Sequence, residues 1–265
     1  MPTVESSGAQ IYWEKHGSGP PLILAAGLGG VSSYWAPNGE ALAANFTLLL
    51  FDQRGTGRSS RVTVDSVEQM STDLIAVMDA AEIESAHCLG HSTGGAIGVA
   101  TALDYPERLR SLMIYASTTC GDPYRHKLLG LRQKIYEGLG LDAYSQYTSL
   151  LLYPPYWINA NADKLAAAEK AAGGQLGSPE VQGSRLDAIL AFDRRADLGS
   201  IHIPTMVLCA DDDILTPRYF SEEYARLIPN AQALFVPRGG HALSRTEPEL
   251  FNQIVIDFFA GKVRS

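Results

Sequence analysis

The chain of 265 residues is 46% hydrophobic and 19% charged, and its 29 acidic and 21 basic residues give a formal net charge of −8. This length is sufficient for one large core, so we expect a single core domain with an insertion. Lysine and arginine form no basic stripe along the chain, which argues against a nucleic-acid partner.

Short β-type segments alternate with segments of helical period in the first part of the chain. In one of the helical segments, Met70, Leu74, Val77 and Met78 follow helical spacing, and Ser66 before them is a suitable N-cap. The alternation predicts a mostly parallel, doubly wound sheet. Strands are predicted at residues 11–14, 22–26, 47–51, 86–89 and 109–115, and helices at residues 36–44, 67–80 and 95–103.

This alternation stops after Cys120. Residues 121–200 contain helical segments without a strong strand and are rich in Tyr, Leu and Ala, so we predict a helical cap insertion there. The core domain is therefore expected to comprise residues 1–120 and 201–265. Strands return at residues 205–209 and 233–236, and a helix follows at residues 247–260, with Pro248 in its first turn.

The motif Gly90-His91-Ser92-Thr93-Gly94 lies between a predicted strand and a predicted helix. A G-x-S-x-G sequence in this context forms the sharp turn that carries a nucleophilic serine, with glycines where the backbone packs closely. The helix N-terminus also favours developing negative charge. We therefore predict that Ser92 is the nucleophile. The alternative is an idle serine in a glycine-rich turn.

A serine nucleophile needs a base, and the base needs an acid that holds it in one tautomer. His241 lies in a glycine-rich turn after the last predicted strand and is the predicted base. The acid is expected after the preceding strand, where Asp211, Asp212 and Asp213 are adjacent, and Asp213 is the predicted member of the triad. The resulting chain order of Ser, Asp and His is that of one of the three known triad architectures. Asp122 is the fallback acid.

Two backbone N–H groups are needed to stabilise the negative charge that develops on the substrate oxygen. Thr93, directly after the nucleophile, is expected to supply one, and Leu28 of the loop Gly27-Leu28-Gly29-Gly30 the other. That loop lacks the G-x-G-x-x-G and Gly-Lys-Ser/Thr patterns of nucleotide-binding loops. Without H-E-x-x-H or a Cys/His cluster in the sequence, no metal and no organic cofactor are expected.

Five motifs together resemble the α/β-hydrolase superfamily over nearly the whole chain. They are Gly27-Leu28-Gly29-Gly30, Phe51-Asp52-Gln53-Arg54-Gly55-Thr56-Gly57, Gly90-His91-Ser92-Thr93-Gly94, Asp213-Ile214-Leu215-Thr216-Pro217 and Gly239-Gly240-His241. The chain is also similar to the branch that contains the aminoacrylate hydrolases called RutD and the 3-oxoadipate enol-lactonases. That similarity lies in Asp52-Gln53-Arg54-Gly55-Thr56-Gly57, Leu103-Asp104-Tyr105-Pro106, Leu152-Tyr153-Pro154-Pro155-Tyr156-Trp157 and Pro237-Arg238-Gly239-Gly240-His241-Ala242.

The resemblance implies a serine hydrolase that acts on a small acid derivative, at an enamine or amide C–N bond, an ester or an enol-lactone. A serine at position 92 separates the chain from haloalkane dehalogenases and epoxide hydrolases, which use a carboxylate nucleophile. A general short-chain carboxylesterase is one alternative. A ligand sensor without turnover, built on the same fold, is an alternative from another class. The oligomeric state is not predicted.

The cap is expected to cover the nucleophile, with Tyr124, Tyr153 and Trp157 as pocket walls, although ordinary packing between cap helices explains each of them equally well. A protein of net charge −8 repels anions at long range, so an acidic substrate needs a local cation. Arg194 and Arg195, at the end of the predicted cap, are the candidates. Their alternative role is a solvated surface contact.

The first ten residues are polar and have neither the basic start nor the apolar segment of a secretory signal. The apolar runs at residues 22–28 and 46–51 are shorter than the ~20 residues that span a bilayer. Cys88, Cys120 and Cys209 lack a C-x-x-C spacing and lie in or beside apolar runs, as buried thiols do in a reducing compartment. We therefore expect a cytoplasmic protein with a small-molecule substrate and no membrane partner.

Overall fold

One sheet runs through the core of the computed structural model, which describes residues 2–172 and 174–262. Its eight strands are β1 (Thr3–Ser6), β2 (Ala9–His16), β3 (Pro21–Ala25), β4 (Thr47–Phe51), β5 (Ala86–His91), β6 (Leu109–Tyr115), β7 (Thr205–Ala210) and β8 (Gln232–Val236). They are ordered β1-β2-β4-β3-β5-β6-β7-β8. β2 pairs antiparallel with β1 and β4, and every pair from β4 through β8 is parallel. The prediction of a mostly parallel, doubly wound sheet is confirmed.

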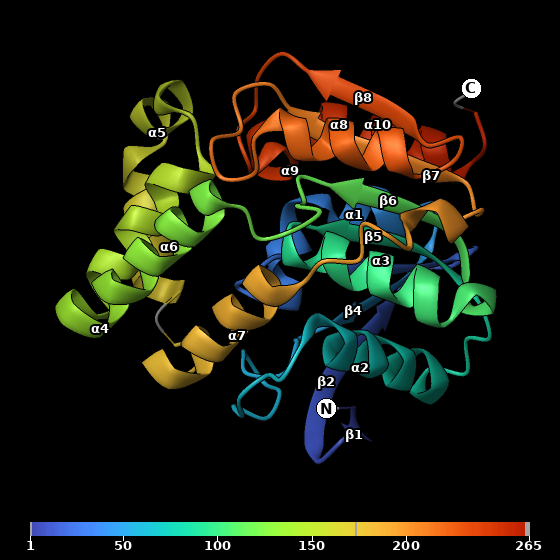
Figure 1. The fold of residues 1–265 in the computed structure, drawn as a ribbon, viewed down its shortest axis with the longest axis horizontal. Helices are drawn as coiled ribbons and strands as arrows, with labels where there is room; N and C mark the ends of the chain where they lie inside the picture. Colours follow the sequence, from blue (N-terminus) through green and yellow to red (C-terminus); the bar gives the residue numbers. More distant parts are fainter. Residues whose placement is uncertain (1, 173, 263–265) are drawn as a thin grey trace.

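Helices cover both faces of this sheet (Figure 1). They are η1 (Ser32–Trp35), α1 (Ala36–Ala43), α2 (Val67–Ala80), α3 (Thr93–Asp104), η2 (Pro106–Arg108), η3 (Leu198–Ser200), α8 (Arg218–Leu227), α9 (Leu243–Thr246) and α10 (Pro248–Phe259). Apolar side chains of α2, α3 and α8 belong to one core cluster, and those of α1 and α10 to another. In β3, Ile23 and Ala25 pack in the first cluster, and Leu22 and Leu24 in the second. This alternation is expected of a strand that is buried on both faces.

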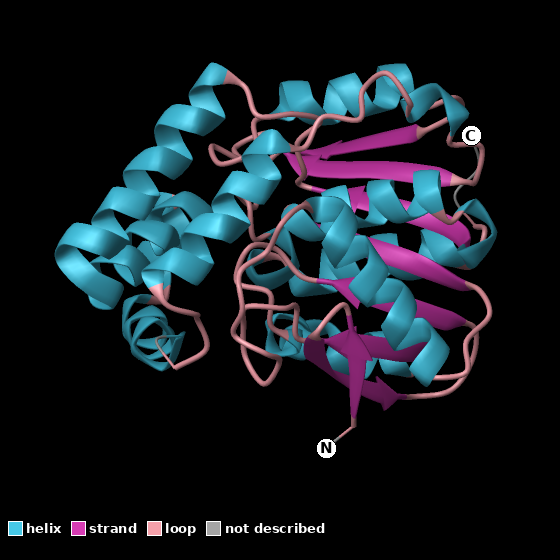
Figure 2. Cartoon of the chain, turned by 60° about the horizontal axis from the view of Figure 1, so that its bottom comes forward, coloured by secondary structure: helices cyan, strands magenta, loops and turns pink. Residues whose placement is uncertain are grey.

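A group of helices lies beyond one end of the strands, between β6 and β7 in the chain (Figure 2). It consists of α4 (Pro123–Leu152), α5 (Pro155–Ala160), α6 (Ala162–Ala172) and α7 (Pro179–Ala191). α4 packs against both α6 and α7 and is interrupted at Gly140, where φ is 81°. These helices fall within the segment for which a helical insertion is predicted. Residues 123–172 and 174–191 are called the cap below.

Helix α2 begins and ends at the predicted residues, Val67–Ala80. The Ser66 hydroxyl accepts a hydrogen bond of 3.1 Å from the Gln69 N–H, which satisfies one of the free donors of the first turn. Met70 and Leu74 are buried on its inner face, as the helical spacing predicts. The sequence therefore specifies this helix through both its cap and its apolar face.

Among the elements that were not predicted are the strand β1 and the helix α8. β1 is a four-residue edge strand of mostly exposed side chains, and its register is set by backbone pairing with β2 rather than by an apolar pattern. α8 buries Phe220, Ser221 and Tyr224. Its apolar residues Phe220, Tyr224 and Leu227 follow a helical spacing that sequence reasoning overlooked. None of the described helices combines the length and apolar character needed to cross a membrane.

Candidate active site

The predicted catalytic residues all follow the carboxyl ends of parallel strands. Leu28 comes after β3, Ser92 after β5, Asp213 after β7 and His241 after β8. These strand ends meet at one edge of the sheet, where ligands bind in open α/β folds. The cap follows β6 at the same edge.

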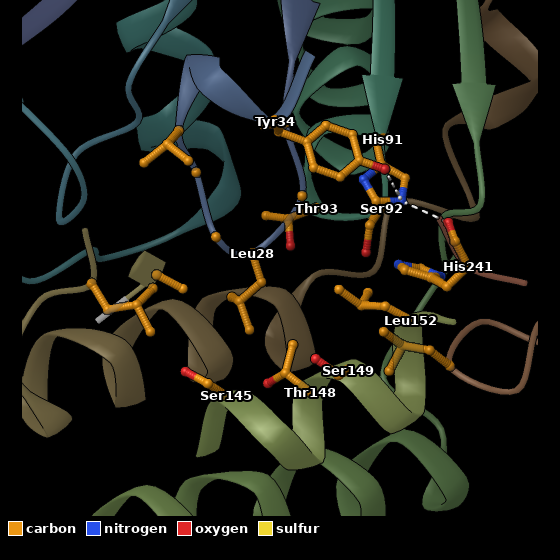
Figure 3. A pocket seen from close by; sticks show the side chains of 18 of the residues that line it. Leu28, Tyr34, His91, Ser92, Thr93, Ser145, Thr148, Ser149, Leu152 and His241 are labelled. Atoms are coloured by element: carbon orange, nitrogen blue, oxygen red, sulfur yellow. Dashed lines mark hydrogen bonds between the residues drawn. The ribbon is translucent and has the colours of Figure 1, made fainter. Parts of the chain in front are cut away.

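Ser92 occupies a strained turn between β5 and α3, with φ 54° and ψ −116°. This positive φ is costly for a residue with a side chain, so surrounding contacts must hold it. The Ser92 N–H donates to the Tyr115 carbonyl over 2.8 Å, and Ser117 Oγ donates to the Ser92 carbonyl over 2.7 Å. The turn presents the Ser92 hydroxyl to the pocket at the N-terminus of α3 (Figure 3).

The glycines of the motif are required by close backbone contacts. A Cβ atom at Gly94 would lie 2.0 Å from the carbonyl oxygen of Ala25, and one at Gly90 would lie 2.2 Å from the carbonyl oxygen of Gly94. Both obstacles are backbone atoms, which cannot rotate away as a side chain can. The steric reason proposed for G-x-S-x-G therefore applies to this turn.

His241 and Asp213 form a buried hydrogen-bonded pair, with exposed fractions of 1% and 3%. His241 Nδ1 lies 2.9 Å from Asp213 Oδ2. The carboxylate is fixed on its other side, because Oδ1 accepts from the N–H groups of Leu215 and Thr216 at 2.8 and 2.9 Å. With Nδ1–H directed to the carboxylate, Nε2 of His241 is the nitrogen left for proton transfer.

The main chain of His241 is held as firmly as its ring. Its carbonyl oxygen accepts from Tyr115 Oη at 2.9 Å. It also accepts from His91 Nε2 at 3.0 Å (Figure 3). His91 stacks between the rings of Tyr34 and Tyr115, at centroid distances of 4.7 and 4.6 Å. Burial, followed by the nearby His241, lowers the pKa of His91 well below its ordinary value. His91 is therefore neutral and positions the His241 loop.

The other acidic candidates have different partners. Asp211 is exposed and pairs with Arg218 at 2.9 Å, and Asp212 Oδ1 accepts from the Gly240 N–H at 2.7 Å. Asp122 is the N-cap of α4 and accepts from the Arg125 N–H. Of the four candidate acids, Asp213 is the one that contacts His241 within the described part of the chain.

Leu28 and Thr93 line the same pocket as Ser92 and His241. In Figure 3, Leu28 and Thr93 lie on one side of Ser92 and His241 lies on the other. The Gly30 N–H donates to the Gly27 carbonyl over 2.9 Å and closes the loop that carries Leu28. Two backbone segments therefore approach the position that a substrate oxygen would take beside Ser92.

Arg185 of α7 holds this loop from the cap, a contact that sequence reasoning missed. Its Nη2 donates to the Leu28 carbonyl over 3.0 Å and to Gln53 Oε1 over 2.6 Å, and its Nη1 donates to the Arg54 carbonyl over 2.6 Å. The side chain is fully buried, and burial lowers its pKa to about 10. An arginine surrounded by carbonyl groups thus fixes the loop of Leu28 against the cap.

The pocket has a volume of about 200 Å³ and is lined by both core and cap. Its cap wall carries the hydroxyl groups of Ser145, Thr148 and Ser149 of α4, which lie across the pocket from Ser92 in Figure 3. This volume suits a small molecule rather than a long acyl chain.

Of the three aromatic residues predicted as pocket walls, Tyr153 lines the pocket. Trp157 stacks on Tyr153 at a centroid distance of 4.4 Å and lies behind it, outside the pocket lining. Tyr124 also lies outside the lining, and its hydroxyl donates to the Ile214 carbonyl beside the acid loop. These two side chains therefore support the walls instead of forming them.

Arg194 and Arg195, the candidate cations of the sequence, lie outside the pocket lining. Arg194 pairs with Asp104 at 3.0 Å and Asp197 at 2.7 Å, and Arg195 pairs with Asp193 at 2.6 Å. Both arginines belong to the solvated surface pairs that were considered as their alternative role.

Three other arginines line the pocket, namely Arg125 and Arg132 of α4 and Arg245 of α9. Sequence reasoning did not single them out. The seven-residue spacing of Arg125 and Arg132 is a usable signal, because residues at i and i+7 lie on one face of a helix. No group of three or more His, Cys, Asp or Glu side chains suited to a metal ion occurs among the described residues.

Residues 20–248 match the family model described as the alpha/beta hydrolase fold. The chain belongs to the α/β-hydrolase family. This α/β-hydrolase is 39% identical over 259 residues to a protein of Azorhizobium caulinodans named as a carbamate hydrolase RutD, with 97% of this chain and 98% of the relative covered. A protein of Caulobacter sp. (strain K31) with the same name is also 39% identical over 259 residues, with 95% and 96% covered.

The enol-lactonase from Burkholderia xenovorans LB400 has a similar solved structure, with a TM-score of 0.90 and 23% sequence identity over 98% of this chain and 100% of that one. At this identity, the likeness establishes the fold alone. The predicted resemblance to the α/β-hydrolase superfamily and its RutD branch is confirmed. The protein is an enzyme of the α/β-hydrolase family.

Proposed function

We propose that this α/β-hydrolase is a serine hydrolase. Ser92 Oγ attacks the carbonyl or equivalent carbon of the substrate while His241 Nε2 takes its proton, and Asp213 holds the imidazole in the required tautomer. The N–H groups of Leu28 and Thr93 stabilise the oxyanion. His241 then protonates the leaving group, and water releases the acyl group from Ser92 by the reverse sequence.

The observation that carries this proposal is the buried His241–Asp213 pair, at 2.9 Å, in the same pocket as a serine on a strained strand-to-helix turn. Strain at a non-glycine residue persists only where the surrounding structure enforces it, and such residues cluster at functional sites. A buried histidine–aspartate hydrogen bond beside such a serine is the arrangement of a general base held by its acid.

We propose as substrate a small acid derivative with a hydrolysable C–N bond, such as a carbamate, amide or enamine, or with an ester or enol-lactone bond. Relatives at 39% identity named as carbamate hydrolases favour the C–N bond. The pocket volume of about 200 Å³ favours a small molecule. A general short-chain carboxylesterase is the second candidate, supported by the same nucleophile and pocket.

The nucleophile is tested with a fluorophosphonate probe, which modifies a serine that has both a base and an oxyanion site. We expect one label per chain, at Ser92, and none in Ser92→Ala. Ser149→Ala is the matched control, because Ser149 lines the same pocket from the cap wall. Labelling that survives Ser92→Ala would contradict the assignment.

Turnover separates the enzyme from a ligand sensor on the same fold. With 4-nitrophenyl acetate, we expect continuous release of 4-nitrophenol by the wild type and none above background by Ser92→Ala. A single burst followed by no further release would favour the sensor. A screen of small carbamates, amides, enamines, lactones and esters then identifies the bond that is cleaved fastest.

A further inference from the structure

Two arginines on one face of α4 point to a charged subsite in the pocket. Arg125 and Arg132 both line it, with exposed fractions of only 4% and 5%. Each guanidinium donates one hydrogen bond to another group of the protein. Arg125 Nη1 donates to the Leu215 carbonyl over 2.8 Å, and Arg132 Nε donates to Thr148 Oγ1 over 3.1 Å.

Neither guanidinium has a carboxylate partner within 4 Å in the described part of the chain, although eight other arginines do. A buried charge is normally paired, because its transfer from water is unfavourable. Burial lowers the pKa of Arg125 to about 10, Asp213 partly opposes this effect, and the neighbouring Arg132 adds to it. Two arginines thus lie close together in the pocket wall, and the pKa of Arg125 stays above neutral pH despite its burial.

The charges around this pair leave the pocket electropositive. Arg245 lines the pocket from α9 and donates to the Tyr34 carbonyl at 3.3 Å and to Tyr153 Oη at 3.4 Å. Glu169 of α6 is the acidic residue of the cap among the lining residues, and it has no recorded ion pair in the described structure. The carboxylate of Asp213 is already occupied by His241 and by the acid loop. Three arginines therefore face one free carboxylate.

We propose that Arg125 and Arg132 bind a carboxylate of the substrate and direct its scissile bond toward Ser92. The planar guanidinium groups match the two oxygens of a carboxylate, and the hydroxyls of Ser145 and Thr148 on the same wall are further donors (Figure 3). The substrate is then an acid whose free carboxylate lies a few bonds from the bond that is cleaved. This inference rests on the function proposed above.

The test compares two esters of one short diacid, the mono-4-nitrophenyl ester of glutaric acid and its methyl 4-nitrophenyl diester. The wild type is expected to prefer the carboxylate ester. Arg132→Gln is expected to lower kcat/KM for that ester by about tenfold or more, mainly through KM, and to change the neutral diester by less than about twofold, as expected when a charge-assisted hydrogen bond is lost. Arg132→Lys is expected to recover part of the loss, because it keeps the charge without the fork.

Arg195→Gln is the matched control, since it removes an arginine from a surface ion pair outside the pocket. Glutarate provides a second measurement on the wild type that needs no variant. Glutarate is expected to inhibit hydrolysis of the carboxylate ester competitively. Its neutral diamide, glutaramide, is expected not to inhibit. Active-site titration with the fluorophosphonate probe counts the folded sites in each preparation.

The outcomes separate the two proposals. If the wild type hydrolyses neither ester and takes no label, the serine hydrolase assignment fails. If it takes the label but prefers the neutral diester, and glutarate inhibits no better than the diamide, the carboxylate subsite is overturned while the hydrolase assignment stands. Equal losses for both esters in Arg132→Gln would also overturn the subsite, because a purely structural role affects both alike.

Discussion

Three adjacent aspartates differ in what their oxygens contact, and this difference predicts their effects on catalysis. Asp213→Asn places an amide where His241 Nδ1 needs an acceptor, so the wrong tautomer is favoured, and we expect kcat to fall by about 10³- to 10⁴-fold. Asp212→Asn keeps an oxygen that can accept from the Gly240 N–H, and Asp211→Asn removes one exposed ion pair. Both should retain kcat within about tenfold.

Steady-state kinetics on one substrate, with circular dichroism to verify folding, measures these three variants. Equal losses in all three would show that the acid lies elsewhere. Asp122 would then be the next residue to replace, although its N-cap contact with the Arg125 N–H argues for a role in starting α4.

The residues of the proposed triad could be selected from sequence because each lies at a locally encoded feature. Ser92 is marked by two glycines, and His241 and Asp213 each follow an apolar strand. The contacts that hold them could not be predicted in this way. The His241 carbonyl accepts hydrogen bonds from Tyr115, which is 126 positions away in the sequence, and from His91, which is 150 positions away. Only tertiary packing brings these residues together.

Among the elements, those with a strong apolar pattern were predicted well. The predicted strand at residues 47–51 and the helix α2 agree with the structure, because burial on one or both faces imposes a period on the sequence. β1 and the amphipathic helix α8 were missed. β1 is short and is held by backbone pairing at an edge. α8 carries Phe220, Tyr224 and Leu227 at helical spacing, a signal that sequence reasoning overlooked.

The arginines that line the pocket show that sequence alone does not place side chains on a helix face. Sequence reasoning looked for a cation at the end of the cap and selected Arg194 and Arg195, whereas the arginines that line the pocket come from α4 and α9. Without a boundary for α4, the seven-residue spacing of Arg125 and Arg132 could not be assigned to a helix face. The need for a local cation was inferred from net charge, but its position required the fold.

The contact between α7 and the loop of Leu28 leads to a prediction about Arg185. Arg185→Met removes the donors to the Leu28 and Arg54 carbonyls and leaves them buried without partners, so both stability and loop position should suffer. We expect Tm to fall, and kcat of the folded enzyme to fall by about tenfold or more with a smaller change in KM, because the oxyanion donor is displaced.

Arg185→Lys keeps the positive charge, but one ammonium group cannot donate to the Leu28 and Arg54 carbonyls as the two guanidinium nitrogens do. Its Tm and kcat are therefore expected to lie between those of the wild type and Arg185→Met. Assays are run well below the Tm of each variant, and the concentration of active sites is taken from fluorophosphonate titration. A loss of stability with unchanged kcat per titrated site would mean that Arg185 is a packing residue with no influence on the oxyanion loop.

Across the whole molecule, the cap is hydrogen-bonded to three of the loops that carry predicted catalytic groups, those of Leu28, Asp213 and His241. Arg185 binds the Leu28 carbonyl, Arg125 binds the Leu215 carbonyl of the acid loop, and the Ala242 N–H next to His241 donates to the Leu152 carbonyl over 3.0 Å. The cap therefore does more than close the pocket, because its position and the geometry of the three loops are coupled.

The contrast between the net charge of −8 and the buried arginines predicts how salt affects an acidic substrate. Raising the ionic strength from about 0.01 to about 0.15 M shortens the Debye length from about 30 to about 8 Å. This screens the long-range repulsion of the acidic surface more than the attraction inside a pocket that excludes water. KM for the mono-4-nitrophenyl ester of glutaric acid is therefore expected to fall by about two- to threefold, and KM for the neutral diester to stay constant.

Sodium chloride titrations of both esters, in the wild type and in Arg132→Gln, measure the effect. If chloride competes for Arg125 and Arg132, it would raise the KM of the carboxylate ester in the wild type but not in Arg132→Gln. A rise in KM with salt that persists in Arg132→Gln would contradict the prediction. It would show that exposed cations attract the substrate, and the surface pairs of Arg194 and Arg195 would then need to open when substrate binds. A fall in the KM of the carboxylate ester in both the wild type and Arg132→Gln would support the prediction. It would show that salt screens the repulsion of the acidic surface, while the buried Arg125 and Arg132 attract the substrate within the pocket.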